Sequence, residues 1–287
     1  MLKTGFCIVL FALAAGCAPT QKPLTDYVNP LLGTATLWDS VDLGFKPTKR
    51  TWGAEVFPGS SLPNAMVQVS PVTKFHSGAG YQYEDSVIYG FTHTNKGHWN
   101  LCHIPLLPVT GTPLPGDYCS PYSHARESAA PGYYRVFLDR YGVDVELTAT
   151  KRVGLHKYTF PASQEAAVVF DLENGGCWDK ATETAFVSDG LRLSGYRYST
   201  GWAKDQRVYF TAEFSKPVKN ISYPDASETV PEEGDVTVKG RYARVEFDTT
   251  DGEPLYMKVA ISPVSIENAK LNMQAELPGW DFEATAA

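Results

Sequence analysis

The stretch of residues 90–103 holds three of the six histidines of the chain, together with a tryptophan and two asparagines. Imidazole and amide groups hydrogen-bond to hydroxyls, and an indole ring stacks on the apolar face of a pyranose. This combination of residue types in one segment favours a carbohydrate-binding site. The residues of this segment that we expect to contact the sugar are His93, His98, Trp99, Asn100 and His103.

A second candidate segment, residues 52–59, places a carboxylate between aromatic side chains. Glu55 and Trp52 therefore join the predicted substrate contacts. Trp38 and Asp39 form a third, weaker candidate earlier in the chain.

Two other interpretations of the histidine-rich segment stay open. Its histidines and Cys102 are possible zinc ligands, but their spacing matches no closed zinc motif. The same polar side chains could instead satisfy backbone groups in a buried loop. No nucleophile elbow or phosphate-binding loop is present in the sequence. The remaining histidines are isolated, and we expect structural roles for them: His76, His124 and His156.

The elements that must position these residues are mostly strands. Short runs rich in β-branched and aromatic residues recur between turn signals, and Val143, Val145 and Leu147 alternate with polar residues. This alternation is typical of antiparallel sheets with one buried face, and the number of runs predicts an all-β sandwich of two sheets. The predicted strands are residues 66–69, 133–138, 143–150, 157–160, 166–172, 191–198, 208–214, 235–238, 243–247 and 255–261.

Two segments depart from this strand pattern. Residues 265–277 have the length and spacing of a short helix. Residues 34–115 contain many glycines and prolines and few clear strands, which predicts long irregular loops. Because such loops in a compact domain are usually functional, the candidate segments fall where function is expected.

Charge and composition limit the classes of partner. The chain of 287 residues carries a net charge of −7 and shows no cluster of lysine and arginine, which argues against a nucleic-acid partner. The hydrophobic content of 43% is enough to build a substantial core.

The first residues have the organisation of a signal peptide. Lys3 precedes an apolar run that is too short to span a bilayer, which needs about 20 residues. Ala-Ala-Gly then precedes Cys17, which resembles a bacterial lipobox with Cys17 as the lipidated residue, and a plain secretory signal is the alternative. We therefore expect a lipoprotein signal over residues 1–17, a linker over 18–25, and an exported chain anchored by lipid to a bacterial membrane, in the periplasm or on the outer surface.

Phrases spread along the chain resemble glycoside hydrolase family 92, whose members are mostly exo-acting α-mannosidases. Each phrase alone is weak, but their order is specific. They include YVNPLLGT at the start of the domain, GFTHT in the histidine-rich segment and PGWDF near the end. The matching phrases occupy residues 27–34, 57–59, 66–71, 90–94, 131–134, 146–150, 209–210, 214–217, 265–269 and 278–282.

This resemblance implies a galactose mutarotase-like β-supersandwich followed by a helical (α/α)₆ barrel, with the active site between them. It also implies an inverting, calcium-dependent enzyme, in which a Glu acid and an Asp base lie about 6.5 to 9.5 Å apart. Family members take both carboxylates and most calcium ligands from the helical domain. We therefore expect no catalytic and no metal residue in this chain, and no hydrolysis by it alone.

The same comparison sets the expected domain boundaries and partners. The β-domain is predicted over residues 26–279, and residues 280–287 would begin a linker to a catalytic domain that the chain lacks. The expected partners are an α-mannoside of N-glycan or mannan type and the helical domain, in cis or as a separate chain. A pseudo-enzyme or a non-catalytic mannoside-binding module is the alternative.

Two departures from the family pattern limit what the resemblance implies. Pro63-Asn64-Ala65-Met66 replaces the usual Pro-Phe-Gly-Met, and the residues after His93 differ from the usual glycine-rich loop. Linkage preference is therefore not implied.

Overall fold

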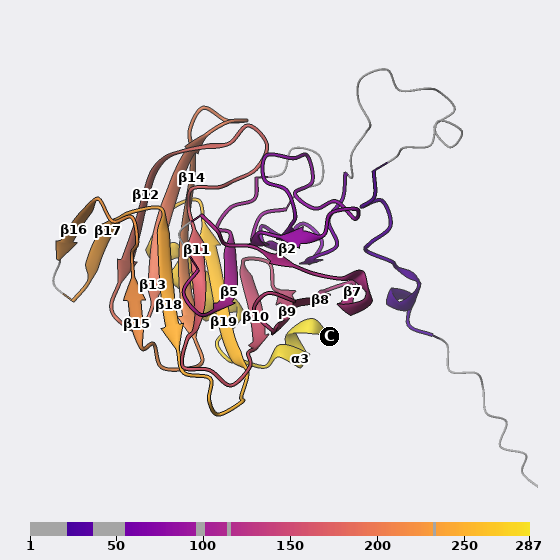
Figure 1. The fold of residues 1–287 in the computed structure, drawn as a ribbon. Helices are drawn as coiled ribbons and strands as arrows, with labels where there is room; N and C mark the ends of the chain where they lie inside the picture. Colours follow the sequence, from indigo (N-terminus) through magenta and orange to yellow (C-terminus); the bar gives the residue numbers. More distant parts are fainter. Residues whose placement is uncertain (1–21, 37–54, 96–100, 114–115, 232–233) are drawn as a thin grey trace, which may run out of the picture.

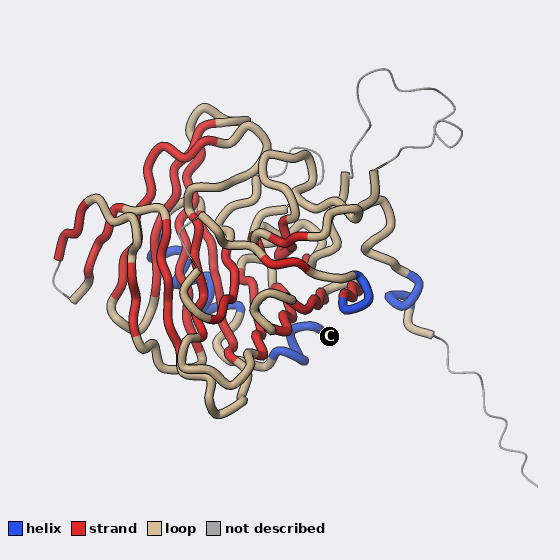
Figure 2. The backbone as a smooth tube through the Cα atoms, viewed as in Figure 1, coloured by secondary structure: helices blue, strands red, loops and turns tan. Residues whose placement is uncertain are grey.

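The computed structural model describes residues 22–36, 55–95, 101–113, 116–231 and 234–287. Within these residues, the strands form a seven-stranded sheet, a ten-stranded sheet and a small two-stranded one, and all their pairings are antiparallel. Strand and loop make up most of the chain, with little helix (Figure 2). The predicted all-β antiparallel sandwich is confirmed.

The seven-stranded sheet contains the strands nearest the candidate segment 90–103. Strand β4 ends just before His93, and β5 begins shortly after His103. In sheet order the strands are β1 (Ser60–Ser61), β2 (Gln68–Val72), β4 (Gly90–Thr92), β5 (Leu106–Thr110), β11 (Ala166–Asp171), β18 (Tyr242–Phe247) and β15 (Asn220–Ser222).

The ten-stranded sheet forms the other layer, and Figure 1 shows β5, β11, β18 and β15 crossing in front of it. In sheet order its strands are β16 (Glu228–Pro231), β17 (Val236–Lys239), β12 (Lys180–Ser188), β13 (Leu193–Thr200), β14 (Gln206–Phe214), β19 (Leu255–Ser262), β10 (Val153–Thr159), β9 (Val143–Ala149), β8 (Tyr133–Leu138) and β7 (Glu127–Ala130). The small sheet pairs β3 (Val87–Ile88) with β6 (Ser120–Pro121).

The main hydrophobic core lies between the two large sheets. Phe170 of β11 and Phe210 of β14 stack across it, with ring centroids 5.9 Å apart. Val143, Val145 and Leu147 are buried in the same core, as their alternation with polar residues predicts. Because each fully buried side chain of this size contributes about 1.5 to 3 kcal/mol, this core supplies most of the stabilisation.

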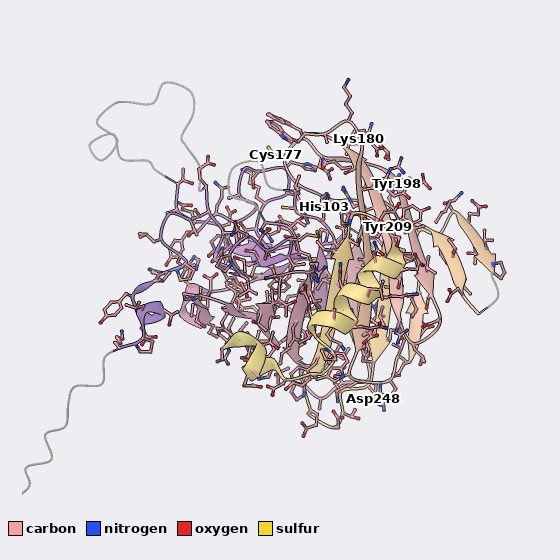
Figure 3. All side chains as sticks on the ribbon, turned by 180° about the vertical axis from the view of Figure 1, so that it is seen from behind. His103, Cys177, Lys180, Tyr198, Tyr209 and Asp248 are labelled. Carbon is pink, nitrogen blue, oxygen red and sulfur yellow. The ribbon has the colours of Figure 1, made fainter. Side chains whose placement is uncertain are left out.

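A second cluster covers the outer face of the ten-stranded sheet, where helices α2 (Ile266–Glu276) and α3 (Phe282–Ala286) pack. Figure 3 shows α2 lying across that face. Helix α2 confirms the helix predicted over 265–277, and the hydroxyl of Ser265 caps it by accepting a hydrogen bond from the Asn268 amide. Phe282 of α3 is buried, so the segment from residue 280 also packs against the sheet.

Two short 3₁₀ helices complete the described elements, η1 (Leu24–Tyr27) and η2 (His124–Arg126). No helix in the described ranges is long and apolar enough to cross a bilayer. The expected lipobox Cys17 lies outside the described residues.

Strand β12 carries an irregularity that matters for the surface described below. It pairs with β13 from Lys180 and Thr200 onward, but the register shifts after Ala181 so that Glu183 faces Tyr198. Thr182 is therefore the extra residue of a β-bulge, which bends a strand and increases its local twist.

Candidate functional site

His93 follows strand β4 directly and has no exposed surface. Its Nδ1 lies 3.0 Å from the carbonyl oxygen of Ile104, and its Nε2 lies 3.0 Å from Nε2 of His156. Nδ1 of His156 lies 2.9 Å from the hydroxyl of Tyr158. His93, His156 and Tyr158 thus form one buried hydrogen-bonded series, which we call the His93 chain.

One arrangement of protons satisfies the His93 chain. A carbonyl oxygen only accepts, so Nδ1 of His93 carries the hydrogen and its Nε2 accepts from His156. Nδ1 of His156 then accepts from the Tyr158 hydroxyl, and both imidazoles are neutral. Burial agrees with this, because it lowers the pKa of His93 to about 4 and that of His156 well below its usual value.

The predicted substrate contact by His93 stays a prediction. In the structure both of its ring nitrogens are used inside the protein, so a direct contact would require breaking two internal hydrogen bonds. Its clear contribution is to fix the start of the histidine-rich segment.

His103 is fixed at the other end of the same segment and is 3% exposed. Its carbonyl oxygen accepts from the His93 amide at 3.0 Å, and its own amide donates to the Thr94 hydroxyl at 2.9 Å. Burial, and then the positive charge of Arg197, lower the pKa of its imidazole to about 4. Within the described part of the chain, neither ring nitrogen has a hydrogen-bond partner.

The charge next to His103 comes from a buried ion pair. Nη2 of Arg197 lies 2.5 Å from Oδ2 of Asp179, and both side chains are almost completely buried. Nε of Arg197 also donates to the carbonyl oxygen of Leu172 at 2.8 Å. We call His103, Asp179 and Arg197 the Arg197 cluster.

The loop of residues 173–179 joins this cluster to the histidine-rich segment. The amide of Gly176 donates to the carbonyl oxygen of Leu101 at 2.9 Å, and Nδ1 of His76 lies 3.0 Å from the carbonyl oxygen of Gly176. A Cβ at Gly175 would come within 1.9 Å of the Asp179 carboxylate, so only glycine fits there. Figure 3 shows His103 and Cys177 at the same end of the molecule.

Comparison with known families decides what this domain is. Residues 27–262 match the glycosyl hydrolase family 92 N-terminal domain. The chain belongs to this family. The resemblance seen in the sequence is thereby confirmed.

Solved structures of family 92 superpose on most of the chain. A GH92 α-mannosidase from Bacteroides thetaiotaomicron, solved alone and with mannoimidazole, is 30% identical, has a TM-score of 0.79 and covers 92% of this chain and 36% of that chain. A GH92 inverting mannosidase from the same organism is 26% identical, with a TM-score of 0.73 and coverage of 91% and 34%. No curated protein matches. The family 92 chain thus spans about a third of the length of these mannosidases.

Glu55 lies apart from the Arg197 cluster. It lines an open pocket of about 380 Å³ together with Phe57 and the turn of Pro131 and Gly132, and none of the pocket's lining residues belongs to the cluster. The other predicted contacts lie outside the described residues: Trp52, His98, Trp99 and Asn100. The grouping of all seven predicted contacts around one sugar therefore stays a prediction.

The calcium implied by the family finds no site in the described residues. These ranges contain no group of three or more His, Cys, Asp or Glu side chains placed to hold a metal ion. The Arg197 cluster does not fit a cation either, because a guanidinium already occupies the place beside its single carboxylate.

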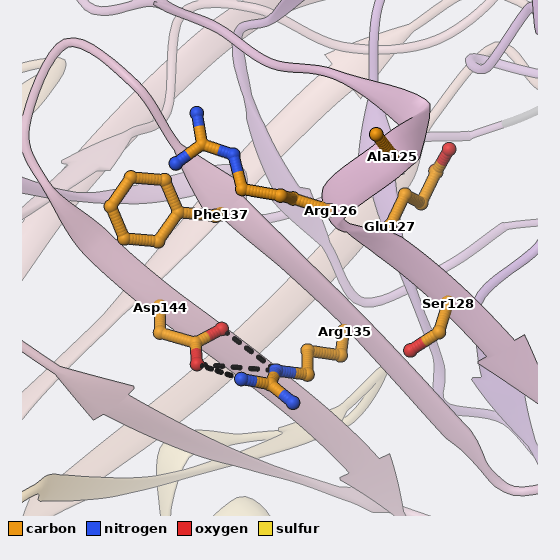
Figure 4. A pocket seen from close by; sticks show the side chains of 7 residues that line it. All are labelled: Ala125, Arg126, Glu127, Ser128, Arg135, Phe137 and Asp144. Atoms are coloured by element: carbon orange, nitrogen blue, oxygen red, sulfur yellow. Dashed lines mark hydrogen bonds and ion pairs between the residues drawn. The ribbon is translucent and has the colours of Figure 1, made fainter.

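A separate pocket of about 320 Å³ lies beside strands β7, β8 and β9 (Figure 4). Arg135 forms a bidentate ion pair with Asp144, with Nη2 and Oδ2 2.5 Å apart. Arg126 pairs with Asp139, and its guanidinium lies 4.1 Å from the centroid of the Phe137 ring. Both arginines are already paired, which makes this pocket a poor anion site.

Sequence reasoning did not single out Asp179 and Arg197. One signal was available for the arginine. Side chains alternate between the two faces of a strand, and Arg197 falls on the same face of its strand as Leu193, which is buried. A charged residue in the buried phase of a strand needs a partner. No comparable signal marks Asp179. It meets Arg197 only because the loop that precedes β12 places it there.

Proposed function

We propose that this chain is the N-terminal, substrate-framing domain of a bacterial exo-α-mannosidase that inverts configuration and acts on α-mannosides of N-glycan or mannan type. The observation that carries the proposal is family membership over residues 27–262. The likeness to an α-mannosidase solved with mannoimidazole supports it. In this proposal the acid and the base come from a helical domain, in cis or as a separate chain.

The part of this chain in the proposal is to build one wall of the cleft. The segment that carries His98, Trp99 and Asn100 in the sequence is fixed at one end by the His93 chain and at the other by the backbone hydrogen bonds of Leu101 and His103. Rigid supports lower the entropy lost when a sugar binds. Indole and imidazole groups then hold the pyranose, with Glu55 and Trp52 as further contacts.

Export and lipid anchoring at Cys17 form part of the same proposal, and the order of charged, apolar and small residues before Cys17 supports them. Expression in a bacterium supplied with labelled palmitate tests this point. We expect label in the membrane fraction for the natural sequence and none for Cys17→Ala. Label in neither protein would contradict the anchor.

The function itself is tested by titrating the purified chain with α-linked mannobioses, with and without calcium, beside a hydrolysis assay. Each assay is run with the chain alone and with the helical domain of a family 92 mannosidase. We expect turnover only in the combination, and a loss of about ten-fold or more for Trp99→Ala, because truncation of an anchoring tryptophan is costly. Leu191→Ala, at an exposed turn, is the control.

Three results would contradict the proposal or one of its residue assignments. Hydrolysis by the chain alone would place the catalytic carboxylates here. Unchanged turnover in Trp99→Ala would remove that residue from the site. Binding without turnover in either setting would favour the mannoside-binding module.

A further inference from the structure

Two large aromatic side chains lie exposed and stacked at one end of the molecule. Trp178 is 58% exposed and Trp202 is 62% exposed, and their rings are 6.1 Å apart between centroids and 14° from parallel. Single exposed apolar residues are common on proteins and need no explanation. A nearly parallel pair of exposed indoles is different, because it presents aromatic surface in one fixed orientation.

Strand pairing explains why the two indoles meet. Lys180 pairs with Thr200 at the end of the β12–β13 ladder, and Trp178 and Trp202 lie two residues beyond this pair, in the loops that enter β12 and leave β13. The approach is close, because a Cβ at Gly201 would lie 3.0 Å from the carbonyl oxygen of Trp178.

The backbone at Trp178 has an unusual conformation, and the residue that follows it is buried. Trp178 has a φ of 58°, in the left-handed region that bulky residues rarely adopt. The next residue is Asp179, which is buried against Arg197. A strained conformation persists only where its surroundings fix it, and the buried ion pair of the next residue is one such restraint.

The pair also lies close to the histidine-rich segment. Gly176, two residues before Trp178, donates its amide to the carbonyl oxygen of Leu101 in the histidine-rich segment. Lys180 follows Trp178 by two residues, and Figure 3 shows it at the same end of the molecule as His103 and Cys177. A ligand bound in the cleft could therefore extend onto the indoles.

We propose that Trp178 and Trp202 form a stacking platform for a mannosyl unit of the glycan beyond the one bound in the cleft. This rests on the proposed function and adds a second contact to it. A neutral pyranose fits the chemistry, because flat exposed indoles match the C–H face of a sugar ring. The net charge of −7 disfavours polyanions as occupants.

Affinity electrophoresis of the purified chain in gels containing α-mannan tests the platform without any catalysis. We expect retardation of the natural sequence, and about ten-fold weaker retardation for Trp178→Ala and for Trp202→Ala. The matched control is Leu191→Ala, which removes a 75% exposed side chain at the other end of the same hairpin. Near-ultraviolet circular dichroism verifies that each variant is folded.

A second measurement uses the indoles themselves. Mannan oligosaccharides should protect the natural chain from fluorescence quenching by acrylamide, and the double variant Trp178→Ala/Trp202→Ala should lose the part of that protection that comes from these two indoles. Equal retardation of variants and natural sequence would overturn the platform. Retardation by dextran in place of mannan would overturn the mannosyl assignment.

The outcome separates this platform from the proposed function. Turnover of a mannobiose by the chain combined with a helical domain tests the cleft and does not need the platform. If the two variants weaken association with the helical domain and leave mannan retardation unchanged, the indoles are covered by that domain and the platform is refuted.

Discussion

The His93 chain and the Arg197 cluster both bury polar side chains beside the histidine-rich segment, yet they differ in charge. In the His93 chain every ring nitrogen has a partner and no group is ionised. The Arg197 cluster buries a full ion pair next to an imidazole whose nitrogens make no hydrogen bond within the described residues. A neutral, satisfied series tolerates burial well, whereas a buried ion pair depends on both of its partners.

The largest expected effect comes from breaking the ion pair. Arg197→Met leaves the Asp179 carboxylate buried without its counter-charge and should lower the free energy of unfolding by about 3 to 5 kcal/mol. Urea denaturation measures the loss. The control Arg207→Met breaks an exposed ion pair with Asp205 and should leave the midpoint nearly unchanged. An Arg197→Met variant as stable as the natural sequence would refute the contrast.

Acid should lower the stability of the folded chain, because both the His93 chain and the Arg197 cluster contain buried neutral histidines. His93 and His103 have pKa values lowered to about 4, whereas an unfolded histidine titrates near 6.5. Below about pH 6.5 the unfolded chain binds more protons than the folded one, so stability falls as the pH drops towards 4. The loss is on the order of 3 kcal/mol for each histidine.

Urea denaturation between pH 7.5 and pH 4, values that bracket the expected titration at roughly 4 to 6.5, measures this slope. His103→Gln should show a smaller loss over the same range, because one titrating group is removed. A flat profile for the natural sequence would contradict the neutral state assigned to both rings.

A smaller effect is expected from crowding the loop that supports Asp179. Gly175→Ala places a Cβ against the carboxylate and should cost about 1 to 3 kcal/mol of stability through overpacking. Gly78→Ala is the matched control, because an added Cβ there meets nothing within 4 Å. Thermal unfolding of the two variants side by side measures the difference, and equal midpoints would show that the loop can shift freely.

The smallest effect should come from the end of the His93 chain. Tyr158→Phe removes the hydroxyl that donates to His156 and leaves a buried acceptor unpaired, at a cost of about 1 kcal/mol. Tyr209→Phe removes a hydroxyl bonded to Tyr198 in a partly exposed setting, where water can replace it. A larger loss for Tyr209→Phe than for Tyr158→Phe would reverse the expected order.

Most of the fold could be predicted from the sequence because alternation of apolar and polar residues is a local signal. Strands β8, β9 and β11 and helix α2 were found this way, each within a few residues of its observed bounds. Strand β5 was missed because Pro108 interrupts it. Strand β4 pairs with β5 only at Leu106, so beyond that residue one edge of β5 has no strand partner in the described residues. Pro108 is tolerated there because it has no backbone N–H to donate to a neighbouring strand.

Strand β12 was missed for another reason. Its first half is largely exposed, and the bulge at Thr182 changes which residues of the sequence face outward. The candidate site shows the same limit. Segment 90–103 was found from its composition, but its supports His156, Asp179 and Arg197 lie far away in sequence and meet it only in three dimensions.

The bulge at Thr182 has a consequence for how this surface could be altered. Deleting Thr182 would keep every cross-strand pair of the β12–β13 hairpin but remove the extra twist. The direction of the Trp178 side chain would then change, while Phe186 would keep its place in the core. Surface orientation and core stability are thus separable within a single hairpin, so one codon offers a starting point for directed evolution of a new ligand preference.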